Sequence, residues 1–92
     1  MVLIQPCRTT RALEAIPEGD LDLDLAALEP RLEQRGWEPR VNAGVMLIVR
    51  KEHEATIFRN GRVLIKTLDL AAAQAVWDDL SPSLTEVSRR GR

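Results

Sequence analysis

The chain has a single cysteine, Cys7, and a single histidine, His53. One cysteine excludes an internal disulfide and a zinc site built from a cysteine cluster, and a lone histidine gives that metal no second imidazole ligand. We therefore expect no metal, and because no glycine-rich phosphate-binding loop is present we expect no cofactor. No apolar run reaches the ~18 residues of a membrane span, and no stretch near the start has the form of a signal peptide. These features favour a cytoplasmic protein.

A surplus of positive charge is also missing, because 13 basic and 14 acidic residues give a net charge of −1. Nucleic-acid-binding domains normally carry a basic surplus, so binding to DNA or RNA is disfavoured. The 92 residues, 45% of them apolar, fit one globular domain. We expect this domain over residues 1–82, followed by a flexible basic tail over residues 83–92.

The clearest local pattern is Arg59-Asn60-Gly61, which separates two runs rich in β-branched and apolar residues at 55–58 and 62–66. Asn and Gly tolerate the positive φ of a tight turn, so the segment predicts a β-hairpin. Three further strands are expected at residues 2–5, 40–42 and 45–49.

Two helices are expected, over residues 21–35 and 69–80. Asp22 or Asp24 can accept the free amide protons at the start of the first helix, whereas Pro30 either kinks that helix or divides it into two short ones. Ser81-Pro82 is expected to end the second helix, and Asp78-Asp79 to lie on its solvated face.

Before the first helix, the spacing of Leu13 and Ile16 indicates one helical turn in otherwise irregular chain. The order β-α-β-β-β-β-α predicts an α+β fold of two layers, an antiparallel sheet with helices on one face.

Strand residues alternate between the two faces of a sheet. One set is uniformly apolar and should meet the helices: Val45, Leu47, Val49, Ala55, Ile57, Val63 and Ile65. The other set is the candidate binding surface: Val41, Met46, Ile48, Thr56, Phe58, Leu64 and Lys66. A solvated face should be mostly polar, yet this one carries five large apolar residues, and an exposed apolar patch usually marks an interface.

Two arrangements would cover that surface. Either the N-terminal segment, residues 7–16, folds over it, or a second chain or another ligand does. We favour the second arrangement. The first hypothesis is therefore a non-enzymatic binding module that forms a homodimer or binds another protein through this face.

Leu21-Asp-Leu23, residues 40–50 and Thr56-Ile-Phe-Arg-Asn-Gly-Arg62 together resemble one repeat of the TATA-box-binding protein. The most specific part, Phe58-x-x-Gly61-Arg62, also resembles the C-terminal tail of bacterial adenylating enzymes that activate ubiquitin-like sulfur carriers. The first resemblance implies half of a saddle-shaped fold. In that family two fused repeats widen the DNA minor groove with phenylalanine wedges, and Phe58 and Val41 match wedge positions. One repeat would need a homodimer, so the second hypothesis is a homodimeric minor-groove DNA-binding protein.

A third hypothesis is an accessory role in sulfur transfer through Cys7. Arg8 and Arg11 are its neighbours in sequence, and positive charge lowers the pKa of a thiol and favours the reactive thiolate. A buried, inert cysteine is the alternative interpretation. A catalytic pair of Cys7 with His53 is compatible with the sequence, although no pattern brings the two together.

Overall fold

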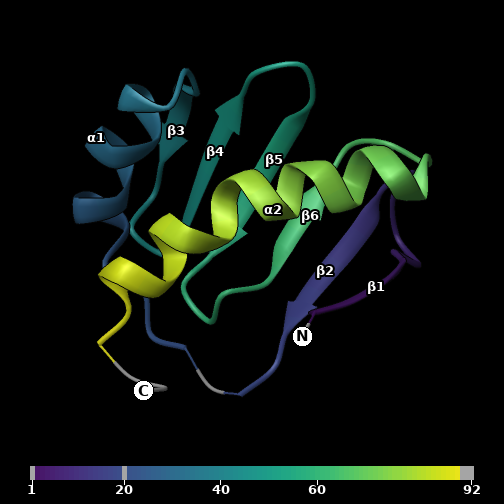
Figure 1. Ribbon diagram of the computed structural model, residues 1–92, viewed down its shortest axis with the longest axis horizontal. Coiled ribbons are helices and arrows are strands. Elements are labelled where there is room, and N and C mark those ends of the chain that lie inside the picture. The colour runs from purple at the N-terminus through teal and green to yellow at the C-terminus, as the bar shows by residue number, and fades with distance from the viewer. Residues whose placement is uncertain (1, 20, 90–92) are drawn as a thin grey trace.

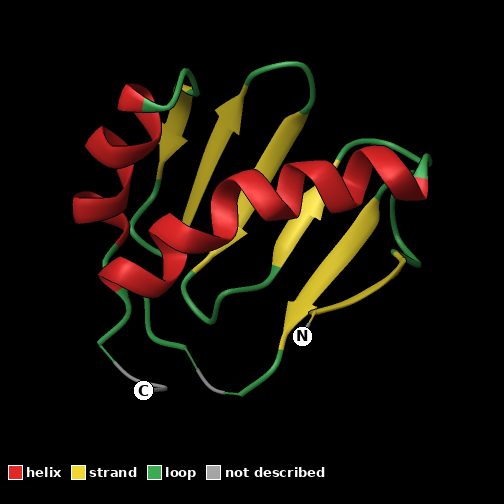
Figure 2. Ribbon diagram, viewed as in Figure 1, coloured by secondary structure: helices red, strands yellow, loops and turns green. Residues whose placement is uncertain are grey.

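The computed structural model describes residues 2–19 and 21–89. Within them the chain forms a two-layer α+β domain, an antiparallel sheet with helices on one face (Figures 1 and 2), which confirms the predicted fold class. The order is β-β-α-β-β-β-β-α, one strand more than predicted. The elements are β1 (Val2–Pro6), β2 (Leu13–Pro17), α1 (Leu25–Gln34), β3 (Glu38–Asn42), β4 (Met46–Arg50), β5 (Glu54–Phe58), β6 (Val63–Ile65) and α2 (Leu70–Val87).

The additional strand is β2, which lies between β1 and β6 in the sheet order β1-β2-β6-β5-β4-β3. Leu13 pairs with Ile65 and Ala15 with Val63, so the helical turn predicted here is wrong. Leu13 and Ile16 point to opposite faces of the sheet, because their separation along a strand is odd. The arrangement in which the N-terminal segment folds over the helix-free face is also wrong, because β1 and β2 extend the sheet within its own plane.

The predicted hairpin joins β5 and β6, but its turn differs from the two-residue form that Asn-Gly suggests. The Gly61 amide donates to the Phe58 carbonyl at 2.9 Å, and the Phe58 amide donates to the Arg62 carbonyl at 2.9 Å. Gly61 has φ of +91°, whereas no residue other than glycine has a positive φ in the described chain. This is a three-residue loop in which glycine alone takes the left-handed conformation.

The core lies between the helices and one face of the sheet. Of the seven residues predicted to meet the helices, six are completely buried: Leu47, Val49, Ala55, Ile57, Val63 and Ile65. Val45 is the exception, since it precedes β4 in a turn and is 64% exposed. Leu13 and Ala15 of β2 join the same core.

Helix α1 begins later than predicted because the preceding residues bond elsewhere. The Leu23 amide donates to the Arg59 carbonyl at 2.9 Å, which holds this segment extended beside the β5–β6 turn. Asp24 then caps the helix by accepting from the Ala27 amide at 3.2 Å. One helix continues through Pro30, so the alternative of two short helices is wrong. Leu25, Leu28 and Leu32 form its buried stripe.

Helix α2 crosses the sheet diagonally (Figure 1) and does not end at Ser81-Pro82. It continues to Val87, and Ser83, Leu84 and Val87 are buried in this last part. Burial of these side chains offsets the ~3 kcal/mol that an internal proline costs. Residues 83–87 of the predicted tail are therefore helical and packed, while residues 90–92 lie outside the described part of the chain. No helix within the described residues is long and apolar enough to cross a membrane.

Strand β3 is an edge of the sheet, and this position accommodates Pro39. Proline cannot donate to a ladder, so strands that contain it are confined to edges or bulges. The register shifts between Pro39 and Val41, which marks a bulge at Arg40. The strand thus begins two residues before the predicted position.

Candidate functional site

The strand register places the predicted binding residues on one face of the sheet, opposite the helices. Residues directly opposed in antiparallel strands share a face. Met46 lies opposite Phe58, and Ile48 lies opposite both Thr56 and Val41. Thr56 in turn lies opposite Leu64. Lys66 follows β6 on this face, and its amide donates to the Glu54 carbonyl at 3.0 Å.

Six of these residues form a continuous apolar patch, by which we mean Val41, Met46, Ile48, Thr56, Phe58 and Leu64. Its exposure increases from the centre to the margin: Thr56 is 8% exposed, whereas Val41 is 47% exposed. Thr56 lies between Ile48 and Leu64 of the neighbouring strands, on the face opposite the helices. The patch is therefore packed within its own layer but has no second layer above it.

One border of the apolar patch is a row of alternating charge. Four charged residues lie side by side here, and we call them the charged row: Lys66 directly after β6, Glu54 on β5, Arg50 on β4 and Glu38 on β3. The ammonium of Lys66 lies 3.5 Å from a Glu54 carboxylate oxygen, and Glu38 pairs with Arg40 at 2.8 Å. Arg50 has no ion-pair partner among the described residues. The row carries two positive and two negative side chains in strict alternation.

The N-terminal hairpin widens this face in a way that sequence reasoning missed. Leu3 of β1 lies opposite Ile16 of β2, and Leu3 is 59% exposed. Between them and the apolar patch lies an ion pair, in which Arg62 is 3.6 Å from Glu14. The sequence signal for this strand was the alternation of Leu13 and Ala15 with Glu14 and Ile16. A pattern of only four residues fits a helical turn equally well.

Cys7 lies in the β1–β2 turn, and its Sγ is 3.5 Å from the Thr9 hydroxyl oxygen. Hydrogen bonding from the Thr9 hydroxyl, and then from the Thr9 amide, lowers the pKa of the thiol. The direction agrees with the sequence prediction, but the cause is hydrogen bonding and not the charge of Arg8 or Arg11. The interpretation of Cys7 as a buried cysteine is wrong, because the side chain lines a surface hollow beside Arg8.

His53 lies in the β4–β5 turn, away from Cys7. Strands β2 and β6 separate β1 from β5, which corresponds to about 14 Å across the sheet at ~4.8 Å per strand. The two residues line different hollows, so they do not form a catalytic pair. In the described chain no group of three or more histidine, cysteine or acidic side chains is arranged to hold a metal ion.

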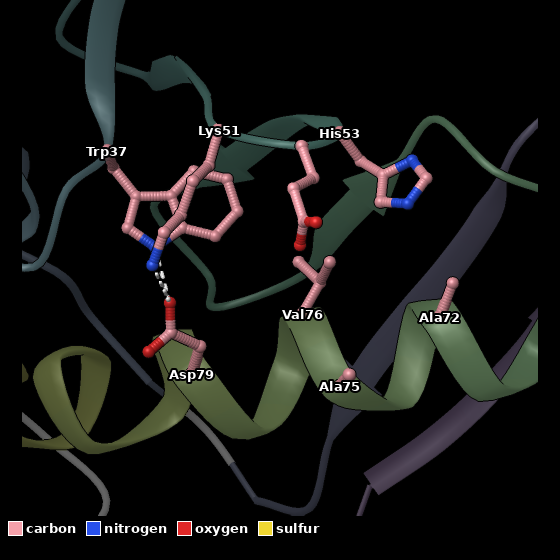
Figure 3. Close-up of a pocket in the computed structure, with 8 residues that line it drawn as sticks. Trp37, Lys51, His53, Ala72, Ala75, Val76 and Asp79 are labelled. Atoms are coloured by element: carbon pink, nitrogen blue, oxygen red, sulfur yellow. Dashed lines mark hydrogen bonds and ion pairs between the residues drawn. The ribbon is translucent and has the colours of Figure 1, made fainter.

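His53 instead lines a pocket of about 280 Å³ between α2 and the β4–β5 turn. Figure 3 shows Trp37, Lys51 and Asp79 converging at one end of this pocket, with Val76, Ala75 and Ala72 along the helix that forms its wall. The Lys51 ammonium lies 5.7 Å from the centre of the Trp37 ring, a cation–π distance. Asp78 is exposed as predicted, whereas Asp79 is only partly exposed and is paired with other side chains.

The Asp79 carboxylate is the centre of a polar cluster. It accepts from the Trp37 indole at 2.7 Å, from Arg35 at 2.7 Å and from Lys51 at 3.3 Å. Partial burial raises the pKa of this carboxyl group, but the hydrogen bonds from Arg35, Trp37 and Lys51 outweigh it and the pKa is lowered. The carboxylate thus ties α2 to the segment between α1 and β3 and to the β4–β5 turn. Its partners already neutralise it, so we assign the cluster a structural role.

No protein-family model matches the chain, and no curated protein or solved structure matches it significantly.

Proposed function

We propose that this protein is a small non-enzymatic binding module that associates, with itself or with a partner protein, through the helix-free face of its sheet. The observation that supports this is the apolar patch bounded by the charged row. In an antiparallel sheet with helices on one side, the second face is normally polar and exposed to solvent. Here Met46, Ile48, Phe58 and Leu64 occupy that face without a covering layer.

The contrast between centre and border supports a protein partner over a nucleic acid. Interfaces between proteins combine an apolar centre with a polar rim, which is the pattern of this face. A phosphate backbone requires a surplus of positive side chains, but the charged row has none: Glu54 pairs with Lys66, and the row carries as many negative as positive side chains. The homodimeric minor-groove binder is therefore the weaker candidate.

We include two further expectations in the proposal. The first is the resemblance to one repeat of the TATA-box-binding protein, in which a helix-free sheet face is also the binding face. The contact between Leu23 and the Arg59 carbonyl supports it, because it brings together two of the matched motifs. The second is a cytoplasmic location, for which the low cysteine content is the support.

A photo-crosslinking amino acid placed at position 58 tests the proposal in living cells. We expect covalent adducts from this position, because Phe58 lies in the apolar patch. The matched control carries the same crosslinker in place of Leu70, which is 60% exposed on α2 and lies outside the face. A second substitution, Ile48→Asp, should abolish the adducts from position 58 by placing a charge in the patch.

Adducts from position 58 that disappear with Ile48→Asp would support the proposal, whether the captured chain is a second copy or another protein. No adduct from position 58, or equal adducts from positions 58 and 70, would contradict it. The mass of each adduct identifies which class of partner is bound.

A further inference from the structure

The charged row is complementary to a second copy of itself, because reversing its order gives the opposite charge at every position. Read from β6 to β3, Lys66, Glu54, Arg50 and Glu38 give the order plus, minus, plus, minus. Read from β3 to β6, the order is minus, plus, minus, plus. A second copy of the same row therefore matches the first when its direction across the strands is reversed.

A two-fold axis that runs parallel to the strands, between β4 and β5, produces this reversal. Such an axis exchanges β4 with β5 and β3 with β6, while it keeps each position along the strands unchanged. Glu54 then faces Arg50 of the second copy, and Lys66 faces its Glu38. An axis perpendicular to the strands would instead place the charged row over Phe58 and Met46, at the opposite end of the apolar patch.

The same axis also matches the apolar patch to itself. Ile48 faces Thr56 of the second copy, and Phe58 faces its Met46. At the margin Leu64 faces Val41, which is half exposed in the single chain. No charge of the row meets an apolar side chain in this arrangement. Two sheets packed in this way lie about 10 Å apart with their strands nearly aligned, as in a β-sandwich.

We infer that the occupant of the helix-free face is a second copy of this chain, docked face to face about a two-fold axis that runs along the strands between β4 and β5. The inference rests on the proposed function and names its partner. Four strands at ~4.8 Å spacing and five residues at ~3.3 Å cover roughly 300 Å² per copy. A standard interface buries about 800 Å² per partner, so this dimer is weak and reversible.

Charge exchange across the axis tests the geometry. In a dimer of Glu54→Arg chains, each new arginine faces Arg50 of the other copy, so like charges meet at two places. In a dimer of Arg50→Glu chains, each new glutamate faces Glu54 of the other copy, with the same result. Each variant alone should lose self-association, with a dissociation constant weakened about tenfold or more. An equimolar mixture of the two should associate again, because every position then meets its opposite charge.

Sedimentation equilibrium of the purified full chain, at concentrations up to about 1 mM, measures these associations, and circular dichroism confirms that each variant is folded. Glu86→Arg is the control, since its partner Arg31 lies on the helix side of the molecule. It should associate as the original chain does.

Association of the original chain, its loss in both single variants and its return in the mixture would support the inference. A monomeric original chain, an association that the exchanges leave unchanged, or a mixture of folded variants that stays monomeric would overturn it. If the original chain is monomeric while position 58 crosslinks to another protein, the proposed function stands and only the self-docking fails. If neither occurs, both fail.

Discussion

The two faces of this sheet have similar side chains and opposite surroundings. On the helix-covered face Leu47, Val49 and Ile57 are completely buried, whereas Ile48 and Phe58 on the other face are only partly covered by their neighbours. Apolar content alone therefore does not tell which face belongs to the core. The two faces differ at their border, because the charged side chains of Lys66, Glu54 and Arg50 lie along the helix-free face only.

The prediction with the largest expected effect on stability compares an isoleucine-to-alanine substitution on each face. Ile57→Ala should lower the free energy of unfolding by about 2–5 kcal/mol, because the change leaves a cavity beneath the helices. Ile48→Ala should cost less than about 1.5 kcal/mol in the monomer, since that side chain is already partly in water. Urea denaturation at low protein concentration measures both values. Equal losses would contradict the distinction between the faces.

A second test compares two turns whose glycines both have positive φ. In Gly61→Ala the new Cβ would lie 2.5 Å from Cδ1 of Leu21, in addition to the backbone strain at φ of +91°. We expect a loss of about 2–3 kcal/mol. Gly44→Ala, with φ of +84° and no atom within 4 Å of the new Cβ, should cost only about 1 kcal/mol. Thermal unfolding measured by circular dichroism gives both losses, and equal losses would show that the β5–β6 turn is not held against Leu21.

A third test compares ion pairs on the two sides. Asp79→Asn should destabilise the fold by about 1–2 kcal/mol, because it weakens hydrogen bonds from Trp37, Arg35 and Lys51. Glu54→Gln, which affects an exposed pair with Lys66 on the helix-free face, should change stability by less than about 0.5 kcal/mol. Denaturation followed by tryptophan fluorescence reports both changes.

The pH dependence of the Asp79 cluster follows from the same contacts. Its pKa is lower in the folded chain than in the unfolded chain, so its contribution to stability is complete above the unfolded value of about 3.9. The contribution is lost as the pH falls through the lower, folded pKa. The difference in stability between the original chain and Asp79→Asn should therefore shrink in acid, and a difference that grows below pH ~4 would contradict the assigned role.

The smallest effect concerns Cys7. Its lowered pKa predicts faster alkylation near neutral pH than a free thiol shows, because more of it is thiolate. Thr9→Val removes the hydroxyl that lies 3.5 Å from the sulfur, so the pH of half-maximal alkylation should rise. Iodoacetamide labelling followed by mass spectrometry measures the rate. An original chain no faster than a free thiol would also remove the sulfur-transfer hypothesis.

The parts of the fold that sequence reasoning found depend on local pattern. The alternation around Ile57 and Ile48 assigned the faces of β4 and β5, and Asn60-Gly61 located the hairpin. Asp24 was found as one of two capping candidates. Each of these signals acts over a few residues, so it needs no knowledge of distant contacts.

The errors occurred where distant contacts outweigh local preference. Residues 13–15 pair with the free edge of β6, and no pattern in the neighbouring sequence reveals that such an edge is available. Pro82 is retained inside α2 because Leu84 and Val87 are buried against the core. Asp79 acquires partners from residues 28, 42 and 44 positions away along the chain.

By itself, the sequence determined that a small antiparallel sheet would have two apolar faces, because side chains along a strand alternate and the pattern is written in neighbouring residues. The tertiary structure alone decided that the N-terminal segment widens the sheet and leaves the second face open. It also aligned Lys66, Glu54, Arg50 and Glu38 in one row. Their order depends on the register of four strands, and register is fixed only when the strands meet.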